Sequence, residues 1–277
     1  MNNLEKWFHS NLGVLRRISQ IGALVLVVLI PILNKNEIYI LLGNFYSLSI
    51  GNLEIADPAI VAQTILLTKK VFLPLLLAGL IPIVITLFLG KVFCSWACPY
   101  FLISEMGAKL RSIFKTPQPS LKNPKPQYYW FIFAGVMLFA IISGVPIITY
   151  FSFPGLISSN IANLVLCGIV GVELFFIFVI LLSEMVFDSR FWCKYFCPVG
   201  AVLSLFLSKN TLKIKLNSVA CGNCEKLSES PCINACVLNL NPKKENLYPY
   251  CNHCFACVDS CQNYGNALTI TFQNKEK

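Results

Sequence analysis

The stretch "GKVFCSWACPYFLI", residues 90–103, decides how this chain is organised. It follows a long apolar run and holds two cysteines that are separated by three residues, with a proline after the second. The stretch "DSRFWCKYFCPVGAVL", residues 188–203, repeats this arrangement behind another apolar run. The chain is therefore expected to consist of two similar halves, related by a pseudo-two-fold axis along a membrane normal. The four cysteines of the two motifs are Cys94, Cys98, Cys193 and Cys197.

The composition indicates a surface that lies partly in lipid. Of the 277 residues, 56% are hydrophobic and only 13% are charged, whereas a soluble domain has about 25% charged residues. The net charge of +9 does not indicate a nucleic-acid partner, because the basic residues cluster beside apolar runs, as membrane topology requires.

Four apolar runs have about the 20 residues that a membrane-spanning helix needs. Pro31 is expected to mark the far end of the first run. The excess of Lys and Arg before the first run, between the second and third, and after the fourth places both termini in the cytoplasm. The four predicted spans are Leu15–Leu33, Val71–Gly90, Tyr128–Tyr150 and Ile161–Phe187.

The segment between the first two spans contains "ADPAIVAQTILL", which predicts a short helix lying on the outer surface. Asp57 is its expected N-cap and Pro58 its first helical residue.

The C-terminal tail carries a ferredoxin-like cysteine pattern. The run Cys251-x2-Cys254-x2-Cys257-x3-Cys261 has the spacing of a bacterial [4Fe–4S] ferredoxin motif. An earlier run has the same order with a longer spacer before its third cysteine. On the crossed ligation pattern, the first cluster takes Cys221, Cys224, Cys232 and Cys261, and the second takes Cys251, Cys254, Cys257 and Cys236.

Zinc is the alternative for these cysteines, since it also binds four thiolates. Compact paired tetrads favour iron–sulfur clusters, although no proline follows Cys236 or Cys261. The flanking stretches "TLKIKLN" and "ALTITF" predict two outer strands. The predicted fold is a mainly α membrane protein: a four-transmembrane-helix bundle plus a small α+β ferredoxin-like domain. The expected boundaries are a cytoplasmic N-terminal segment at 1–14, the membrane domain at 15–210 and the cytoplasmic two-cluster domain at 211–277.

Taken together, the four spans, the two Cys-x3-Cys-Pro motifs and the double ferredoxin run resemble the NapH type of membrane iron–sulfur protein. "RRISQ" at residues 16–20 and "ADPAIVAQ" at residues 56–63 are also similar to that family. The resemblance implies a location in the bacterial inner membrane. It also implies a quinol dehydrogenase component that passes electrons from membrane quinol to a periplasmic NapG-type iron–sulfur protein or a cytochrome, towards a nitrate or nitrous oxide reductase.

Two other classes of function remain open. One is a thiol or metal redox protein related to cytochrome oxidase assembly factors, which share the Cys-Pro motifs. The other is a structural scaffold or redox-sensing membrane regulator. Transfer of electrons from a quinol analogue into the clusters would distinguish these classes.

Glu173 and Glu184 are the candidate proton-transfer residues. Glu173 is expected near the middle of the fourth span, where an ionisable group costs about 2.5–3.5 kcal/mol and usually has a function. Both would lie on one helical face with Ile177 and Ile180. The alternative is a neutral carboxyl group that is hydrogen-bonded to a neighbouring helix.

The cysteines of the two repeated motifs have three interpretations. They could form a structural turn with idle or paired thiols, a dithiol–disulfide relay, or a third metal centre shared by both halves. A shared centre requires all four thiolates to converge at the cytoplasmic end of the bundle. Lys91, Arg190 and Lys194 are expected to stabilise these thiolates by lowering their pKa.

Overall fold

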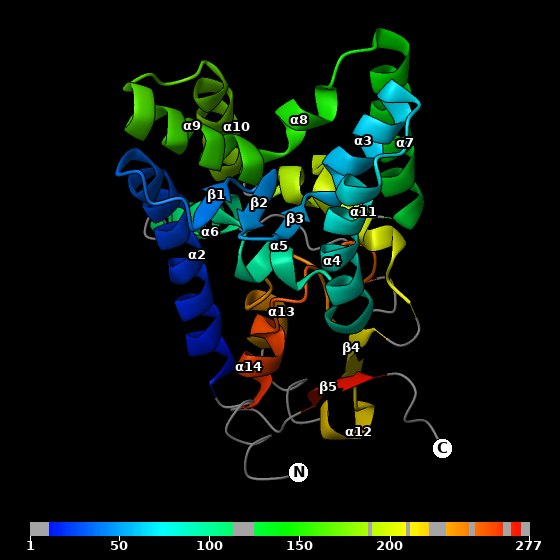
Figure 1. Cartoon of the computed structure of the whole chain (residues 1–277). Coiled ribbons are helices and arrows are strands. Elements are labelled where there is room, and N and C mark those ends of the chain that lie inside the picture. Colours follow the sequence, from blue (N-terminus) through cyan, green and yellow to red (C-terminus); the bar gives the residue numbers. More distant parts are fainter. Residues whose placement is uncertain are drawn as a thin grey trace.

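The computed structural model describes residues 11–112, 125–187, 190–208, 211–221, 231–243, 247–262 and 267–272. Its two helical halves carry a small C-terminal part at one end (Figure 1). The first half contains α2 (Leu12–Lys35), β1 (Leu41–Gly43), β2 (Ser47–Ile50), β3 (Leu53–Ala56), α3 (Pro58–Thr68), α4 (Leu73–Leu89), α5 (Val92–Trp96) and α6 (Pro99–Ser112).

The second half repeats this order with a helix in place of the three-stranded antiparallel sheet. It contains α7 (Pro126–Ser143), α8 (Ile147–Phe151), α9 (Phe153–Cys167), α10 (Glu173–Phe187), the π-helical turn η1 (Trp192–Phe196) and α11 (Pro198–Leu205).

Among the described residues, α2 is the one helix that is by itself long and apolar enough to cross a membrane. It continues through Pro31 to Lys35, so the expectation that Pro31 ends it is wrong. Its 24 residues separate into two faces: Val14 and Ile18 are exposed, whereas Arg16 and Gln20 are buried. Shorter apolar helices accompany α2, among them α3, α4 and α9.

The second predicted span agrees with α4, but the third and fourth are each divided. Gly144, in a left-handed conformation, ends α7 before α8 begins. Gly168, also left-handed, ends α9, and a turn at residues 168–172 precedes α10. Glu173 is therefore the first residue of α10, and its predicted place in the middle of a span is wrong.

Two short helices start deep in the molecule. Asp57 caps α3 by accepting a hydrogen bond from the Ala59 backbone N–H at 2.9 Å, as the sequence predicts. However, Pro58 and Ala59 are buried, so α3 does not simply lie on the surface. The start of α9, "FPGLI" at residues 153–157, is equally buried and matches "DPAIV" at residues 57–61.

Hydrogen bonds join α3 and the residues before it to α8 and to Ser152, the residue before α9. Ser152 donates from Oγ to Asp57 Oδ2 at 3.0 Å, and the Ile148 backbone N–H donates to Gln63 Oε1 at 2.7 Å. Tyr46 donates from its hydroxyl to the Thr149 carbonyl at 2.8 Å. The contacts hold the two halves together at the level where their cysteine motifs begin.

The C-terminal part consists of β4 (Leu212–Leu216), α12 (Ser218–Cys221), α13 (Pro231–Asn234), α14 (Ala256–Gln262) and β5 (Leu268–Phe272). The two strands predicted from "TLKIKLN" and "ALTITF" are present and pair antiparallel, with Leu212 opposite Phe272. In addition, α14 packs against the first turn of α2, where Gly13 approaches the Asp259 carboxylate.

Candidate metal centres

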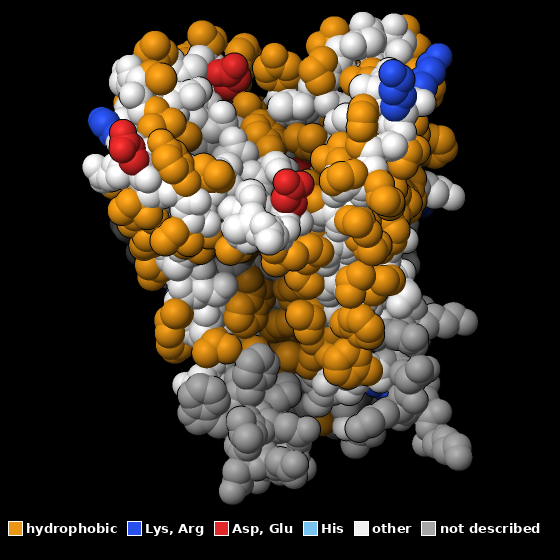
Figure 2. All heavy atoms as spheres, in the orientation of Figure 1, with side chains coloured by type: hydrophobic (Ala, Val, Ile, Leu, Met, Phe, Trp, Pro, Cys, Tyr) orange, Lys and Arg blue, Asp and Glu red, His pale blue; other side chains and the backbone are white. Residues whose placement is uncertain are grey.

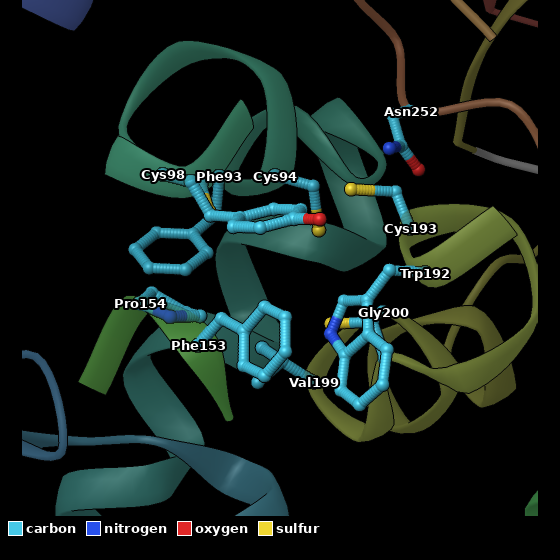
Figure 3. A pocket seen from close by; sticks show the side chains of 12 residues that line it. Phe93, Cys94, Cys98, Phe153, Pro154, Trp192, Cys193, Val199, Gly200 and Asn252 are labelled. Atoms are coloured by element: carbon cyan, nitrogen blue, oxygen red, sulfur yellow. The ribbon is translucent and has the colours of Figure 1, made fainter. Parts of the chain in front are cut away.

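The four cysteines of the repeated motifs line one pocket, which we call the membrane-half pocket. Cys94 lies on α5 and Cys193 on η1, while Cys98 and Cys197 each precede a helix that starts with proline. Proline is favoured at a first helical position because the amide hydrogen that it lacks has no partner there. The empty space of the pocket, including the part that is open to solvent, is about 400 Å³, and the Cys193 side chain points towards Cys94 (Figure 3).

Aromatic side chains form much of the wall. Phe93, Tyr100, Phe153 and Trp192 all line the pocket, and Phe153 stacks on Trp192 with ring centroids 4.0 Å apart and planes 2° apart. The buried indole Nε1 of Trp192 has no hydrogen-bond partner. An unpaired donor in a pocket with four thiols fits a sulfur-rich anionic group such as an iron–sulfur cluster.

Burial dominates the electrostatics of these thiols. It raises the pKa of Cys94 to about 12, and it also raises the pKa of Cys98, Cys193 and Cys197. Lys91 lowers the pKa of Cys94 and Cys197 in the expected direction, but desolvation outweighs this effect, so both pKa values are raised. A bound metal would change this balance, since coordination deprotonates a thiol outright.

A second pocket, which we call the tail pocket, is lined by cysteines from both runs of the tail. Its empty space, including the part that is open to solvent, is about 350 Å³, and the Leu240 backbone N–H donates to Cys236 Sγ at 3.3 Å. His253 and Phe255 adopt left-handed conformations with φ of 50° and 55°, which turn the chain between successive cysteines. Non-glycine residues rarely adopt this conformation, and it concentrates at functional sites. The cysteines of the tail pocket are Cys236, Cys251, Cys254 and Cys257, the set predicted for the second cluster.

The cysteines predicted for the first cluster lie in another apolar cluster. Cys221, Cys232 and Cys261 are buried there beside Leu12 and Phe255, and Cys224 lies outside the described residues. Cys257 and Cys261 of the second run both belong to this apolar cluster, whereas Cys236 of the first run lines the tail pocket. Within the described ranges, no three His, Cys, Asp or Glu side chains are close enough to hold a single metal ion.

The membrane-half pocket and the tail pocket are adjacent, because Asn252 lines both. The loop that contains Asn252 is bound to the first Cys-x3-Cys motif: Ser95 Oγ donates to the Asn252 carbonyl at 2.7 Å, and Trp96 Nε1 donates to the His253 carbonyl at 3.3 Å. The Lys91 backbone N–H donates to His253 Nδ1 at 3.1 Å. Sequence reasoning missed this junction, although "CNHC" places Asn252 and His253 inside the ligand run.

The two candidate glutamates differ in environment. Glu184 is buried, accepts a hydrogen bond from Ser104 Oγ at 3.1 Å and accepts another from the Trp192 backbone N–H at 2.9 Å. It is thus connected to a wall residue of the membrane-half pocket. Glu173, by contrast, is half-buried beside Gly171 at the turn that precedes α10.

A third buried carboxylate, Glu105 on α6, was not identified from the sequence. It pairs with Arg16 at 2.9 Å and with Arg17 at 2.6 Å. From the sequence, the two arginines belong to the basic excess before the first span and to a family-like stretch, and their ion pairs fix α2 against α6.

Comparison with protein families indicates a similarity to iron–sulfur proteins. A family model described as "4Fe-4S binding domain" matches residues 71–117 and 170–215. Each matched segment is the later part of one half, and together they contain the four cysteines of the membrane-half pocket. The cysteine pockets and this match make the chain similar to iron–sulfur proteins of the ferredoxin type.

Three individual relatives give a more specific comparison. The chain is 26% identical to the ferredoxin-type protein NapH of Haemophilus influenzae, over 92% of this chain and 88% of that one. It is 27% identical to the methylamine utilization ferredoxin-type protein MauN of Paracoccus denitrificans, over 79% and 73%. A putative electron transport protein, YccM of Escherichia coli, is 28% identical over 69% and 53%. The resemblance to NapH-type iron–sulfur proteins is therefore confirmed. No solved structure matches significantly.

Proposed function

We propose that this protein is a membrane electron-transfer subunit that accepts electrons from quinol and passes them through three iron–sulfur clusters towards a periplasmic reductase. The main observation in support of this proposal is that Asn252 lines both the membrane-half pocket and the tail pocket. Such adjacency suits transfer of single electrons, the chemistry that bound clusters would supply.

A membrane location is supported by the apolar surface of the helical halves. Ile18 on α2 is 63% exposed, and Phe175 on α10 is 64% exposed. Apolar side chains cover most of the described part of one face (Figure 2). We place α2, α4, α7 and α10 across the bilayer, because exposed large apolar side chains on this scale favour lipid over water.

The chain's own residues would hold the clusters and keep water away. Cys94, Cys98, Cys193 and Cys197 would ligate a cluster in the membrane-half pocket, inside the aromatic wall. The tail pocket would hold the second cluster, and Cys221, Cys224, Cys232 and Cys261 would hold the first. Because the membrane-half pocket adjoins the tail pocket, electrons would pass directly between the membrane-half centre and the second cluster.

Quinol oxidation also releases protons, and we assign Glu184 and Glu173 to proton acceptance. Glu184 is the stronger candidate because its carboxylate is hydrogen-bonded to the backbone of Trp192, which lines the membrane-half pocket. Glu173, at the start of α10, would continue the route towards the turn between α9 and α10.

The test combines iron analysis with reduction by a quinol analogue, on full-length protein purified anaerobically in detergent. Three clusters predict about twelve irons, four per cluster. Cys94→Ser and Cys193→Ser should each remove the same increment of about four irons. Cys167→Ser, which alters an exposed cysteine outside every motif, should retain them all.

In the same preparation, the quinol analogue should bleach the cluster absorption of the wild-type protein. Glu184→Gln should slow this reduction while the iron content stays constant, and Glu173→Gln should slow it less. Full iron content in both serine variants would exclude a shared membrane-half cluster and favour a thiol relay. If the clusters stay oxidised in the presence of the quinol analogue, the proposal that quinol is the electron donor is wrong.

A further inference from the structure

Two cations occupy equivalent positions in the repeat. Lys91 lies three residues before Cys94, and Arg190 lies three residues before Cys193. Each cation therefore lies shortly before a cysteine of the membrane-half pocket in the sequence. Because the two halves otherwise differ in sequence, a basic side chain at both equivalent positions indicates that the shared pocket requires positive charge there.

Lys91 is buried between the two pockets, with only 1% of the residue exposed. Its Nζ donates to the Pro249 carbonyl and lies 5.6 Å from the centre of the Tyr129 ring. Its nearest charged partners would be thiolates of both pockets, namely Cys94, Cys251 and Cys197. Among the described residues, no carboxylate is within salt-bridge distance of Lys91.

Arg190 occupies the corresponding place in the second half. Its guanidinium lies 5.8 Å from the centre of the Phe101 ring, and the buried Nη1 has no hydrogen-bond partner. It is within electrostatic reach of Cys193 in the membrane-half pocket and of Cys254 in the tail pocket. Glu105 and Glu184 also face it, so its charge is shared more widely than that of Lys91.

Burying a cation without a carboxylate partner, as for Lys91, is costly unless other anionic groups lie close to it. A cluster bound by four thiolates is such a group, and each electron that it accepts adds negative charge. A nearby fixed cation stabilises the reduced form more than the oxidised form, and net charge is one of the factors that set cluster potentials.

We propose that Lys91 and Arg190 are shared counter-cations of the membrane-half centre and the second cluster, and that they raise the reduction potentials of both. The proposal rests on the proposed function, because it requires clusters in the two adjacent pockets. In this proposal, Lys91 and Arg190 tune the reduction potentials and do not ligate the clusters. No cysteine predicted for the first cluster is among the thiols within electrostatic reach of Lys91 or Arg190, so the potential of that cluster should not depend on them.

The experiment is a redox titration of the full-length protein, with each cluster followed by its electron paramagnetic resonance signal. Lys91→Met and Arg190→Gln should each shift two of the three signals to lower potential and leave the third in place. Arg190→Lys keeps the charge and should restore the wild-type potentials. Lys35→Met removes an equal charge from the far end of α2, where Lys35 Nζ donates to the Val165 carbonyl, and should shift none.

Iron and sulfide contents are measured on every sample, so that potentials are compared at equal cluster occupancy. If Lys91→Met loses iron, the comparison of Arg190→Gln with Arg190→Lys decides the matter alone. Unchanged potentials in Arg190→Gln, or equal shifts in all three signals, would overturn the proposal. A wild-type protein without a membrane-half cluster would instead contradict the proposed function.

Discussion

Asp57 shows how one residue can serve both the fold and the site. Its carboxylate caps α3 and accepts the Ser152 hydroxyl, which joins the two halves. Burial raises the pKa of Asp57 to about 6, although the hydrogen bonds to its side chain oppose that shift. Asp57 also lies within electrostatic reach of Cys94 and Cys197, so an anionic cluster in the membrane-half pocket would raise its pKa further.

The raised pKa predicts a specific pH dependence of stability. An unfolded aspartate titrates near 3.9, so between about pH 4 and pH 6 the native state holds a proton that the unfolded state has lost. The contribution of Asp57 to the free energy of unfolding therefore falls as pH rises through this window, by up to about 3 kcal/mol for two pKa units. Asp57→Asn retains an acceptor oxygen for the cap and should flatten this dependence.

Thermal unfolding in detergent at pH 4.5 and pH 7 would measure the effect as the difference between variant and wild type. Asp57→Asn should raise the unfolding temperature at pH 7 more than at pH 4.5. Glu54→Gln, at an exposed site on β3, should show no such difference. An equal response of the two variants would contradict the prediction.

At the scale of elements, the cap and strand signals were readable from sequence, whereas the divided spans were not. Asp57 and Pro58 predicted the start of α3 because capping is a local effect. Hydropathy gave continuous runs through Gly144 and Gly168, because a turn made of apolar residues and glycine remains hydrophobic. The buried starts of α3 and α9 depend on contacts between the halves, which no local pattern contains.

The candidate sites, too, were only partly predictable from the sequence. Convergence of Cys94, Cys98, Cys193 and Cys197 followed from the repeat, and the tail pocket followed from cysteine spacing. The junction at Asn252 and His253 did not, because it depends on how the tail packs against α5. The Glu105 ion pairs with Arg16 and Arg17 likewise join residues that are distant in sequence.

Gly90 is the glycine on which this junction depends, and it supplies a test at the element scale. It ends α4 with a φ of 78°, and a Cβ atom there would lie 2.4 Å from His253 Nε2. Gly90→Ala should therefore destabilise the protein by at least about 1–3 kcal/mol from backbone strain alone. It should also reduce the iron retained by the tail pocket.

Gly22→Ala is the matched control, since a Cβ at Gly22 within α2 would meet nothing within 4 Å. Alanine there should stabilise the helix by about 0.5–1 kcal/mol. Unfolding temperature and iron content together measure both variants. Equal iron retention and equal stability in the two proteins would show that the contact of Gly90 with His253 is unimportant.

At the scale of the whole molecule, the C-terminal part lies at one end of the two helical halves (Figure 1). The first turn of α2 packs against α14 of the tail, while α4 and α10 both lead into the cysteine motifs. With α2 placed across a bilayer, its start and the tail lie on the same side. The excess of basic residues there favours the cytoplasmic side.

Reporter fusions test this topology. Green fluorescent protein fused after Lys277 should fluoresce, whereas alkaline phosphatase at the same place should be inactive. The reverse result is expected for the same reporters inserted at Ile169, in the turn between α9 and α10. Active phosphatase at the C-terminal position would reverse the orientation, and matching results at both positions would contradict the placement of α10 across the bilayer.

The position of Asn252 in both pockets has a consequence for how the protein is made. Residue 252 is synthesised after all four cysteines of the membrane-half pocket, the last of which is Cys197. During translation, the helical halves can insert and bring these cysteines together while one wall of their pocket does not yet exist. A cluster delivered at that stage would be exposed to oxygen and to competing metals. Maturation of the membrane-half centre should therefore follow release of the finished chain from the ribosome.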